Sequence, residues 1–332
     1  MNKGAHRLCL TLLLVIGMTT LPTCGGKGNP AGPGPIPTPL PSPSPSQPPP
    51  PQLTPLRTSG VTFVDSTGRP VNLAGAIICC YDPYTIPHGW PYIDEAALDE
   101  IAEAGANYTH IRLGPFKRED DPLGGAYESD GTPTNQAYWS RIQDIINYAL
   151  SRRIYVEVDV IDGWAIRHVL TAWPSWEGWC GVLQEAPQEI HRQWITKVAQ
   201  ELSAFPNVIF QVGNENGVCT PQPVSIEWES GVRQILLANM RNGRRLIGTN
   251  SQDPAIEAEM DYASYHGTNL PSVGGIPVQI NEYRYLTPEA YRDTLNRASM
   301  LGVYFHLWRG TQKDEEWTKS LGYLKEWRAS HP

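Results

Sequence analysis

Short apolar runs alternate with longer amphipathic stretches along the chain from Val61 onward. Each short run has the length and composition of a buried strand, and the longer stretches repeat apolar residues at helical spacing, as Ala97, Leu98 and Ile101 do. The eight runs that we predict to be strands cover residues 71–76, 107–113, 154–161, 208–212, 246–249, 262–265, 276–280 and 303–307. Strands that alternate with helices over about 270 residues predict a (β/α)8 barrel, an α/β fold.

Two regions depart from this regular alternation. Residues 61–70 are predicted to form a small hairpin ahead of the first strand, with its turn at Thr67-Gly68. Between residues 251 and 276 the chain is so short that the helices after the fifth and sixth strands are expected to be very short or absent. The barrel domain is predicted to span residues 57–332.

Two of the predicted strands end in the same dipeptide, Asn-Glu. The fourth strand ends at Asn214-Glu215 and the seventh at Asn281-Glu282, which places the two glutamates 67 residues apart (282 − 215). Burying a carboxylate beside an apolar strand costs free energy unless the carboxylate is paired or hydrogen-bonded. Paired carboxylates at the strand ends of a parallel barrel are the equipment of a retaining glycosidase, with one acid/base and one nucleophile. The alternative is that both are loop carboxylates on a solvated rim.

Other polar and aromatic residues fall just past the predicted strand ends, where a barrel of this kind builds its site. They are Arg112, Asp159, Asp162, Trp164, Asn214, His266 and Trp308, in addition to the two glutamates. The order of an Arg on strand two, Asn-Glu on four, His near six, Glu on seven and Trp on eight resembles the clan A glycoside hydrolases. The family-five cellulases and mannanases are the nearest pattern, and the resemblance covers about residues 58–330.

The resemblance implies a role for each of these positions. Glu215 would be the acid/base and Glu282 the nucleophile, with Arg112 holding Glu282 ionised. Asn214 would bind the sugar 2-hydroxyl, and Trp308 would form the floor under the reacting sugar. Either His266 or Tyr265 would hydrogen-bond near the two carboxylates, while Asp162 and Trp164 would contact substrate. The pattern implies an enzyme that hydrolyses β-glycosidic bonds in a polysaccharide or oligosaccharide, with endo action favoured.

The sequence departs from the family at two places. A His usually follows strand three, where this chain has Asp159-Val-Ile-Asp162, and Thr268 stands where a Tyr usually follows the strand-six His. A carbohydrate-binding barrel that has lost turnover is the alternative from a different class, although both carboxylates are present. A metal-dependent barrel hydrolase is a third alternative. It would need clustered His ligands, whereas the eight His of this chain are scattered along the sequence. No cofactor or metal is predicted.

Composition and charge narrow the class of partner. The 332 residues carry a net charge of −8 with no basic stripe, which argues against nucleic acid. Several of the eleven Trp fall in predicted loops, most of them between residues 164 and 179, where they could stack on sugar rings or simply pack in the loop. A monomer acting on a carbohydrate is the expectation.

The N-terminal part of the chain has the composition of an export signal and a tether. Lys3 and Arg7 precede the apolar run 8–18, which is too short to span a bilayer. Residues 21–24 resemble a bacterial lipobox, so Cys24 would be lipidated; a plain cleavable signal over residues 1–24 is the alternative. Residues 25–56 form a predicted linker, and 29–56 contain thirteen Pro. At about 3.1 Å per residue that stretch could reach roughly 80 Å. The protein is expected to be exported and anchored to a bacterial membrane, or secreted if Cys24 is not lipidated.

The remaining cysteines fit an oxidising compartment. Cys180 and Cys219 follow the third and fourth predicted strands, so they would lie in neighbouring loops of one barrel face, and we predict a disulfide between them. Cys79 and Cys80 are adjacent and could form a strained bridge or remain thiols.

Overall fold

The computed structural model describes residues 52–78, 93–113, 134–163, 186–215, 224–266, 274–283, 287–309 and 314–331. Eight parallel strands close into a barrel in the order β10-β3-β4-β5-β6-β7-β8-β9. Their bounds are β3 Ala74–Ile77, β4 Tyr108–Arg112, β5 Tyr155–Asp159, β6 Val208–Gln211, β7 Ile247–Thr249, β8 Tyr262–His266, β9 Val278–Tyr283 and β10 Tyr304–Trp308. The predicted (β/α)8 fold is confirmed, and every predicted strand is present with ends shifted by a few residues.

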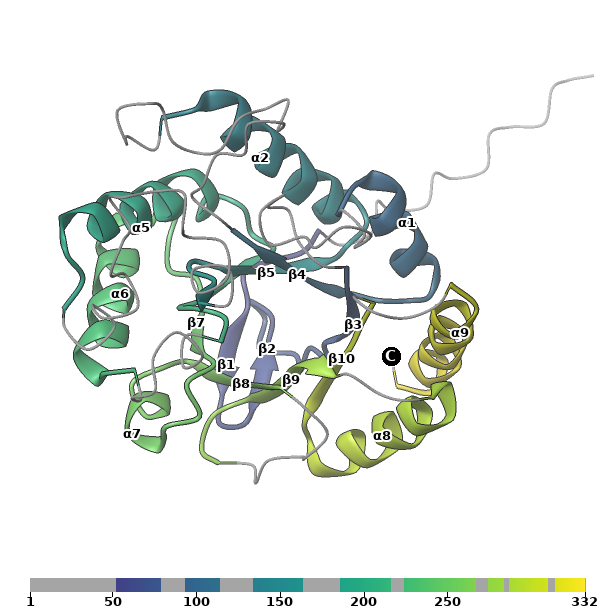
Figure 1. Cartoon of the computed structure of the whole chain (residues 1–332). Coiled ribbons are helices and arrows are strands. Elements are labelled where there is room, and N and C mark those ends of the chain that lie inside the picture. Colours follow the sequence, from purple (N-terminus) through teal and green to yellow (C-terminus); the bar gives the residue numbers. More distant parts are fainter. Residues whose placement is uncertain are drawn as a thin grey trace, which may run out of the picture. The chain divides into compact units, whose positions relative to one another are not determined.

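Helices surround the ring of strands (Figure 1). The described helices are α1 Glu95–Glu103, α2 Gln136–Ser151, α5 Glu189–Leu202, α6 Ile226–Asn239, α7 Pro254–Glu257, α8 Pro288–Leu301 and α9 Asp314–Ser330. Local sequence sets several of their ends, since the Asp94, Ser225 and Thr287 side chains accept a backbone N–H in the first turn. Helix α7 has four residues, as expected for the short segment after the fifth barrel strand. None of the helices in the described ranges is long and apolar enough to cross a membrane.

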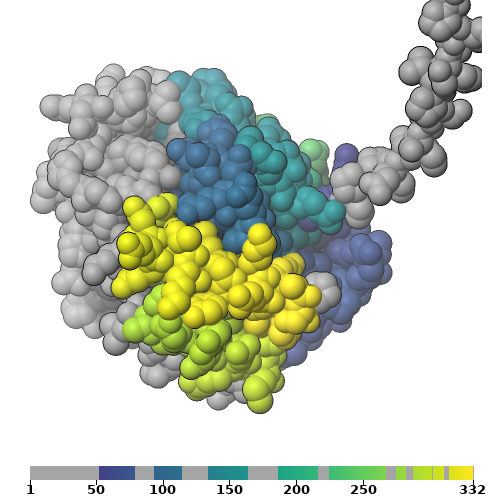
Figure 2. All heavy atoms as spheres, turned by 90° about the vertical axis from the view of Figure 1, so that its right-hand side faces the viewer, coloured from purple at the N-terminus to yellow at the C-terminus, as the bar shows by residue number. Residues whose placement is uncertain are grey.

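The last helix closes the ring against the first one. Helix α9 lies beside α8 and also beside α1, as the yellow, yellow-green and blue surfaces show in Figure 2. The contact with α1 is polar: the Glu100 carboxylate accepts from the Trp317 indole N–H at 2.7 Å and pairs with Arg309 at 3.3 Å. Four tryptophans, Trp139, Trp194, Trp228 and Trp317, are fully buried among the helices and strands. These four serve the core, while the five tryptophans of the predicted loops lie outside the described residues.

A hairpin closes the amino-terminal end of the barrel. Strands β1 (Arg57–Ser59) and β2 (Thr62–Val64) pair antiparallel around Gly60, and Thr67-Gly68 makes the next turn, after which Val64 bridges Pro70. The predicted hairpin over residues 61–70 is present with its turn at Thr67-Gly68, and a further turn at Gly60 precedes it. Phe63 of β2 packs on the rings of Tyr262 and Tyr304, which begin β8 and β10. Its backbone N–H also donates to the Tyr304 hydroxyl at 3.1 Å, so this end of the barrel is filled by aromatic packing.

Candidate active site

The carboxyl-terminal ends of the strands bring the predicted site residues to one rim of the barrel. Arg112, His266 and Trp308 are the last residues of β4, β8 and β10, and Asn214 and Glu215 follow β6 by a few residues. Asp162 forms a parallel bridge with Asn214, which places it on the same rim. Because all eight strands run in parallel, residues far apart in the sequence converge here.

Glu215 is held at both its backbone and its carboxylate. Its φ of 48° lies in the left-handed region, which is uncommon for a residue with a side chain. The Glu215 backbone N–H donates to the Asn250 side-chain oxygen at 3.2 Å. Its Oε1 lies 3.3 Å from His266 Nδ1. Burial lowers the pKa of His266, so this ring is neutral near neutral pH. A neutral ring lets Glu215 keep a proton, whereas a cationic ring would favour the carboxylate.

Asn214 is fixed by its neighbour across the rim. Its Nδ2 donates to Asp162 Oδ1 at 3.3 Å, its backbone N–H donates to Ile161, and its carbonyl accepts from Gly163. An ionised Asp162 can only accept, so the Asn214 amide turns its NH2 toward Asp162 and its oxygen the other way. This orientation points the Asn214 side-chain oxygen away from Asp162.

Strand β9 has an irregularity at the second Asn-Glu. Tyr265 pairs with Ile280, but the next residue, His266, pairs with Glu282, so one residue of β9 is extra at this point. A bulge of this kind re-aims the residues that follow it and is frequent beside active sites. The backbone of Glu282 thereby takes the register position opposite His266, the residue whose ring reaches Glu215.

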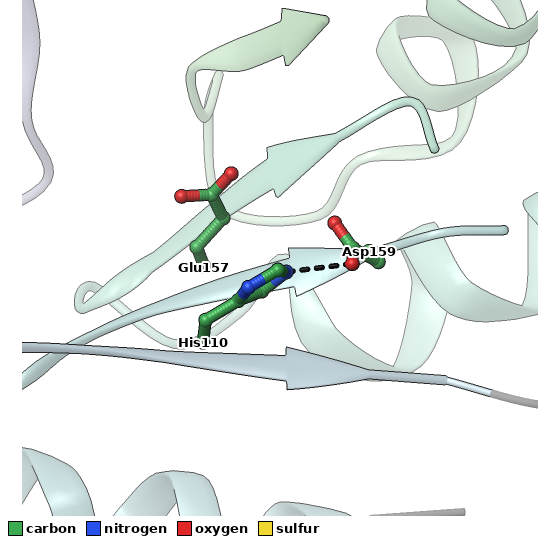
Figure 3. Close-up of side chains that lie close together, drawn as sticks. All are labelled: His110, Glu157 and Asp159. Carbon is green, nitrogen blue, oxygen red and sulfur yellow. Dashed lines mark ion pairs between the residues drawn. The ribbon is translucent and has the colours of Figure 1, made fainter. Parts of the chain in front are cut away.

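Arg112 lies beside the buried pair of Asp159 and His110. Its Nε is 4.0 Å from Asp159 Oδ2, which in turn lies 2.6 Å from His110 Nε2 (Figure 3). Burial raises the pKa of Asp159 well above its usual range, and burial lowers the pKa of His110 to about 4. Both shifts favour the uncharged forms of the two groups. Arg112 therefore adds a positive charge to this end of the barrel, which favours ionised carboxylates nearby.

The middle of the barrel contains a hydrogen-bonded polar network. Glu157 is fully buried and accepts from the Tyr108 hydroxyl, from Gln279 and from Ser264. His110, Glu157 and Asp159 bring possible metal-binding atoms within 4.8 Å of one another, with His110 from β4 beside the two acids of β5 (Figure 3). Hydroxyl and amide donors already occupy the Glu157 oxygens, and His110 Nε2 is paired with Asp159 Oδ2 at 2.6 Å. The donor set therefore fits an internal network better than a metal cage.

The structure changes the roles expected for Tyr265 and Trp308. Tyr265 faces the outer side of β8, where its hydroxyl donates to Glu257 of α7 at 2.5 Å; His266 is the member of that pair that faces Glu215. Trp308 is only 2% exposed and packs with Ile77 in the barrel interior, at the end of β10. The Glu282 side chain, Trp164, Cys24 and the Cys180 and Cys219 pair lie outside what the structure describes.

Comparison with known proteins agrees with this geometry. The sequence matches the cellulase family, glycosyl hydrolase family 5, over residues 64–242, which is more than half of the chain. The chain belongs to glycosyl hydrolase family 5. No curated protein sequence matches it significantly.

Solved glycoside hydrolases share the fold of this family 5 chain at low sequence identity. A family 5 glycoside hydrolase from Bacteroides vulgatus is 12% identical with a TM-score of 0.57; the match covers 76% of this chain but only 61% of that structure. The β-mannanase of the blue mussel Mytilus edulis is 12% identical with a TM-score of 0.57, covering 82% and 97%. The catalytic domain of the Thermobifida fusca endoglucanase Cel5A is 14% identical with a TM-score of 0.51, covering 79% and 87%.

Sequence reasoning missed the residues that hold the site together. No sequence motif predicted the contact of Asn250, just after β7, with Glu215, or the β9 bulge at Asn281. An Asn at the end of a predicted strand was the available signal for Asn250. The bulge leaves no mark in the apolar pattern, because its extra residue lies beyond the last apolar position of the strand.

Proposed function

We propose that this family 5 domain is a retaining endo-β-glycanase in which Glu215 is the acid/base and Glu282 the nucleophile. The observation that carries the proposal is the position of His266 between the two residues. Its ring contacts Glu215 Oε1 at 3.3 Å, and its backbone pairs in register with Glu282. Glu215 follows β6, two strands before β8, and Glu282 lies in β9, the strand after β8, so both belong to the same rim of the barrel.

The chemistry follows from the two environments. In the first step the Glu282 carboxylate attacks the anomeric carbon while Glu215 gives its proton to the departing oxygen. In the second step Glu215 takes a proton from water, which attacks the same carbon and releases Glu282. Arg112 supports the ionised nucleophile, and the neutral His266 beside Glu215 is compatible with a protonated acid. Asn214 offers its oxygen to the sugar 2-hydroxyl, because Asp162 occupies its NH2 group.

A covalent label and the product stereochemistry test the two assignments. A 2-fluoro glycoside with an activated leaving group should add one sugar mass to the peptide that contains Glu282, and proton NMR should show that early products keep the anomeric configuration. The exposed Glu326 of α9 provides a control, since Glu326→Gln should label like the parent protein. Inverted products, or a label on a different carboxylate, would refute the mechanism.

The substrate class is a β-linked polysaccharide or oligosaccharide. The similar solved structures include β-mannanases and an endoglucanase, so mannan and glucan oligosaccharides are the first substrates to compare. Product sizing would separate endo action, which gives a ladder of intermediate lengths, from release of single units. Binding without turnover on this panel would favour a carbohydrate-binding barrel instead.

We also propose that the protein is exported and held at a bacterial membrane as a monomer. The support is in the sequence: a charged start, a short apolar run, a lipobox-like Cys24 and a Pro-rich linker. Cys24→Ser should move the protein from the membrane fraction to the soluble fraction.

A disulfide between Cys180 and Cys219 is part of the same proposal, because an exported protein folds in an oxidising compartment. Peptides that contain these two cysteines should gain the mass of the alkylating reagent only after reduction.

A further inference from the structure

Asn250 ties together three strands at the rim beside Glu215. Its side-chain oxygen accepts from the Glu215 backbone N–H at 3.2 Å, and its NH2 donates to the Ser264 backbone oxygen at 3.1 Å. Glu215 follows β6, Asn250 follows β7 and Ser264 lies within β8. One amide therefore links the residue that we assign as the acid/base to the strand that ends in His266.

The contact falls on the strained part of Glu215. A φ of 48° costs energy for a residue with a Cβ, and such a conformation persists only where the surroundings enforce it. Asn250 holds the backbone N–H of this residue, while His266 contacts the carboxylate at the other end of the side chain. Both ends of Glu215 are thus held from β7 and β8, which restricts where its carboxyl group lies.

We propose that Asn250 is a positioning residue that keeps the Glu215 carboxyl aligned with the leaving-group oxygen. The proposal rests on the proposed function of Glu215 as the acid/base. Proton transfer needs close alignment, and a displacement of about 1 Å can cost roughly 100-fold in rate. Loss of Asn250 should therefore impair protonation of the leaving group specifically, while attack by the nucleophile is retained.

The test compares two substrates that differ in their need for an acid. An alkyl glycoside has a poor leaving group that must be protonated, whereas a dinitrophenyl glycoside leaves without a proton. In Asn250→Ala, kcat/KM for the alkyl substrate should fall about 10- to 100-fold, and for the dinitrophenyl substrate less than about threefold. Equal losses on both substrates would show that Asn250 has only a structural role.

Asn107 provides a matched control at the opposite end of the barrel. Its oxygen accepts from the Ala74 N–H at 2.9 Å and its NH2 donates to the Asn72 backbone oxygen at 3.1 Å, the same pair of backbone bonds that Asn250 makes. Asn107→Ala should lower Tm by a similar amount and leave the ratio of the two kcat/KM values unchanged. If Asn107→Ala also changes the ratio of the two kcat/KM values, that ratio responds to any loss of stability in the barrel. The proposal would then fail.

A second variant separates the two bonds of Asn250. Asn250→Asp keeps an acceptor for the Glu215 N–H and loses the donor to Ser264, so it should restore most of the alkyl-glycoside activity that Asn250→Ala loses. If Asn250→Asp loses as much alkyl-glycoside activity as Asn250→Ala, the effect comes from the lost bond to the Ser264 backbone oxygen of β8. That result would overturn the proposal. The Asp variant also carries the test if Asn250→Ala does not fold by circular dichroism.

Glu215→Gln, measured in parallel, distinguishes failure of this proposal from failure of the proposed function. If Glu215→Gln is selective for the alkyl substrate and Asn250→Ala is not, the Asn250 proposal falls and the assignment of Glu215 stands. If Glu215→Gln slows both substrates equally, Glu215 is not the acid, and the role of Asn250 falls with it.

Discussion

His191→Gln should remove one defined part of the acid sensitivity of the fold. His191 lies in the first turn of α5, is 2% exposed, and packs edge-on against Trp228 with ring centroids 5.1 Å apart. Its Nδ1 accepts from the Gln188 backbone N–H at 3.1 Å, so a proton added there would destroy that bond. Burial lowers the pKa of His191 from 6.5 to about 3. Gln can accept the same backbone N–H, as it commonly does at this helix position.

The magnitude follows from the two pKa values. Because the folded-state pKa is depressed below the unfolded value, stability is complete above pH 6.5 and is lost as the pH falls toward 3. At pH 5.0 the unfolded chain has gained the proton and the folded chain has not, which costs 1.36 × (6.5 − 5.0), or about 2 kcal/mol. At pH 7.5 the same effect is below about 0.1 kcal/mol.

Guanidinium unfolding at pH 7.5 and pH 5.0 measures this difference. The free energy of unfolding of the parent protein should fall by about 2 kcal/mol more between the two pH values than that of His191→Gln. The lost contact with Trp228 lowers the stability of the variant equally at both pH values, so it cancels. His191→Leu should show the same reduced pH dependence but lower stability throughout, since Leu cannot accept the Gln188 N–H. An unchanged pH dependence in both variants would refute the reasoning.

Three further outcomes test the barrel and its boundaries. Gly248→Ala would bring a Cβ to 2.3 Å from the buried Tyr262 ring and should cost about 1–3 kcal/mol in thermal unfolding, while Gly274→Ala, with open space, should cost much less. Burial raises the pKa of Glu157 above 4.5, so Glu157→Gln should match the parent stability near pH 4 and gain about 1.4 kcal/mol per pH unit above 4.5, up to the folded-state pKa. A chain beginning at Gln52, which keeps the buried Leu56 and the Thr54 bonds to Tyr155 and Ser66, should keep its turnover on a soluble glycan, and loss of its fold by circular dichroism would place part of the preceding segment in the domain.

The strands and the two catalytic candidates were predictable because each leaves a local mark. A buried barrel strand needs a short apolar run, and the Asn214-Glu215 and Asn281-Glu282 strand ends repeat one chemical pattern. The contacts between those strand ends were not predictable, because they depend on register. Nothing near Asn250 in the sequence shows that it reaches Glu215, and the choice between Tyr265 and His266 depends on which side of β8 faces inward.

The polar interior of the barrel explains why the contacts between strand ends could not be predicted without the strand register. Strands such as β5, which reads Tyr-Val-Glu-Val-Asp, alternate apolar and polar residues, a pattern that usually indicates one face in water. Here the apolar side packs against helices, as Val156 and Val158 do, and the polar side, including Glu157 and Asp159, points into the barrel.

The inward polar residues are not isolated from the site. Asn281, the residue before Glu282, donates to Gln211 at 3.0 Å, and Gln211 donates to Asp159 at 2.7 Å. Asp159 in turn contacts His110 and lies near Arg112. This chain of contacts runs from the β9 bulge through β6 to β4 and β5, so β6 and β9 are each held from inside the barrel by an amide. Buried amides tolerate little displacement without losing a bond, and each lost bond leaves an unsatisfied polar group. The polar interior is thus a physical reason for the backbones of β6 and β9 to keep a fixed separation, and the proposed retaining chemistry requires such a fixed framework.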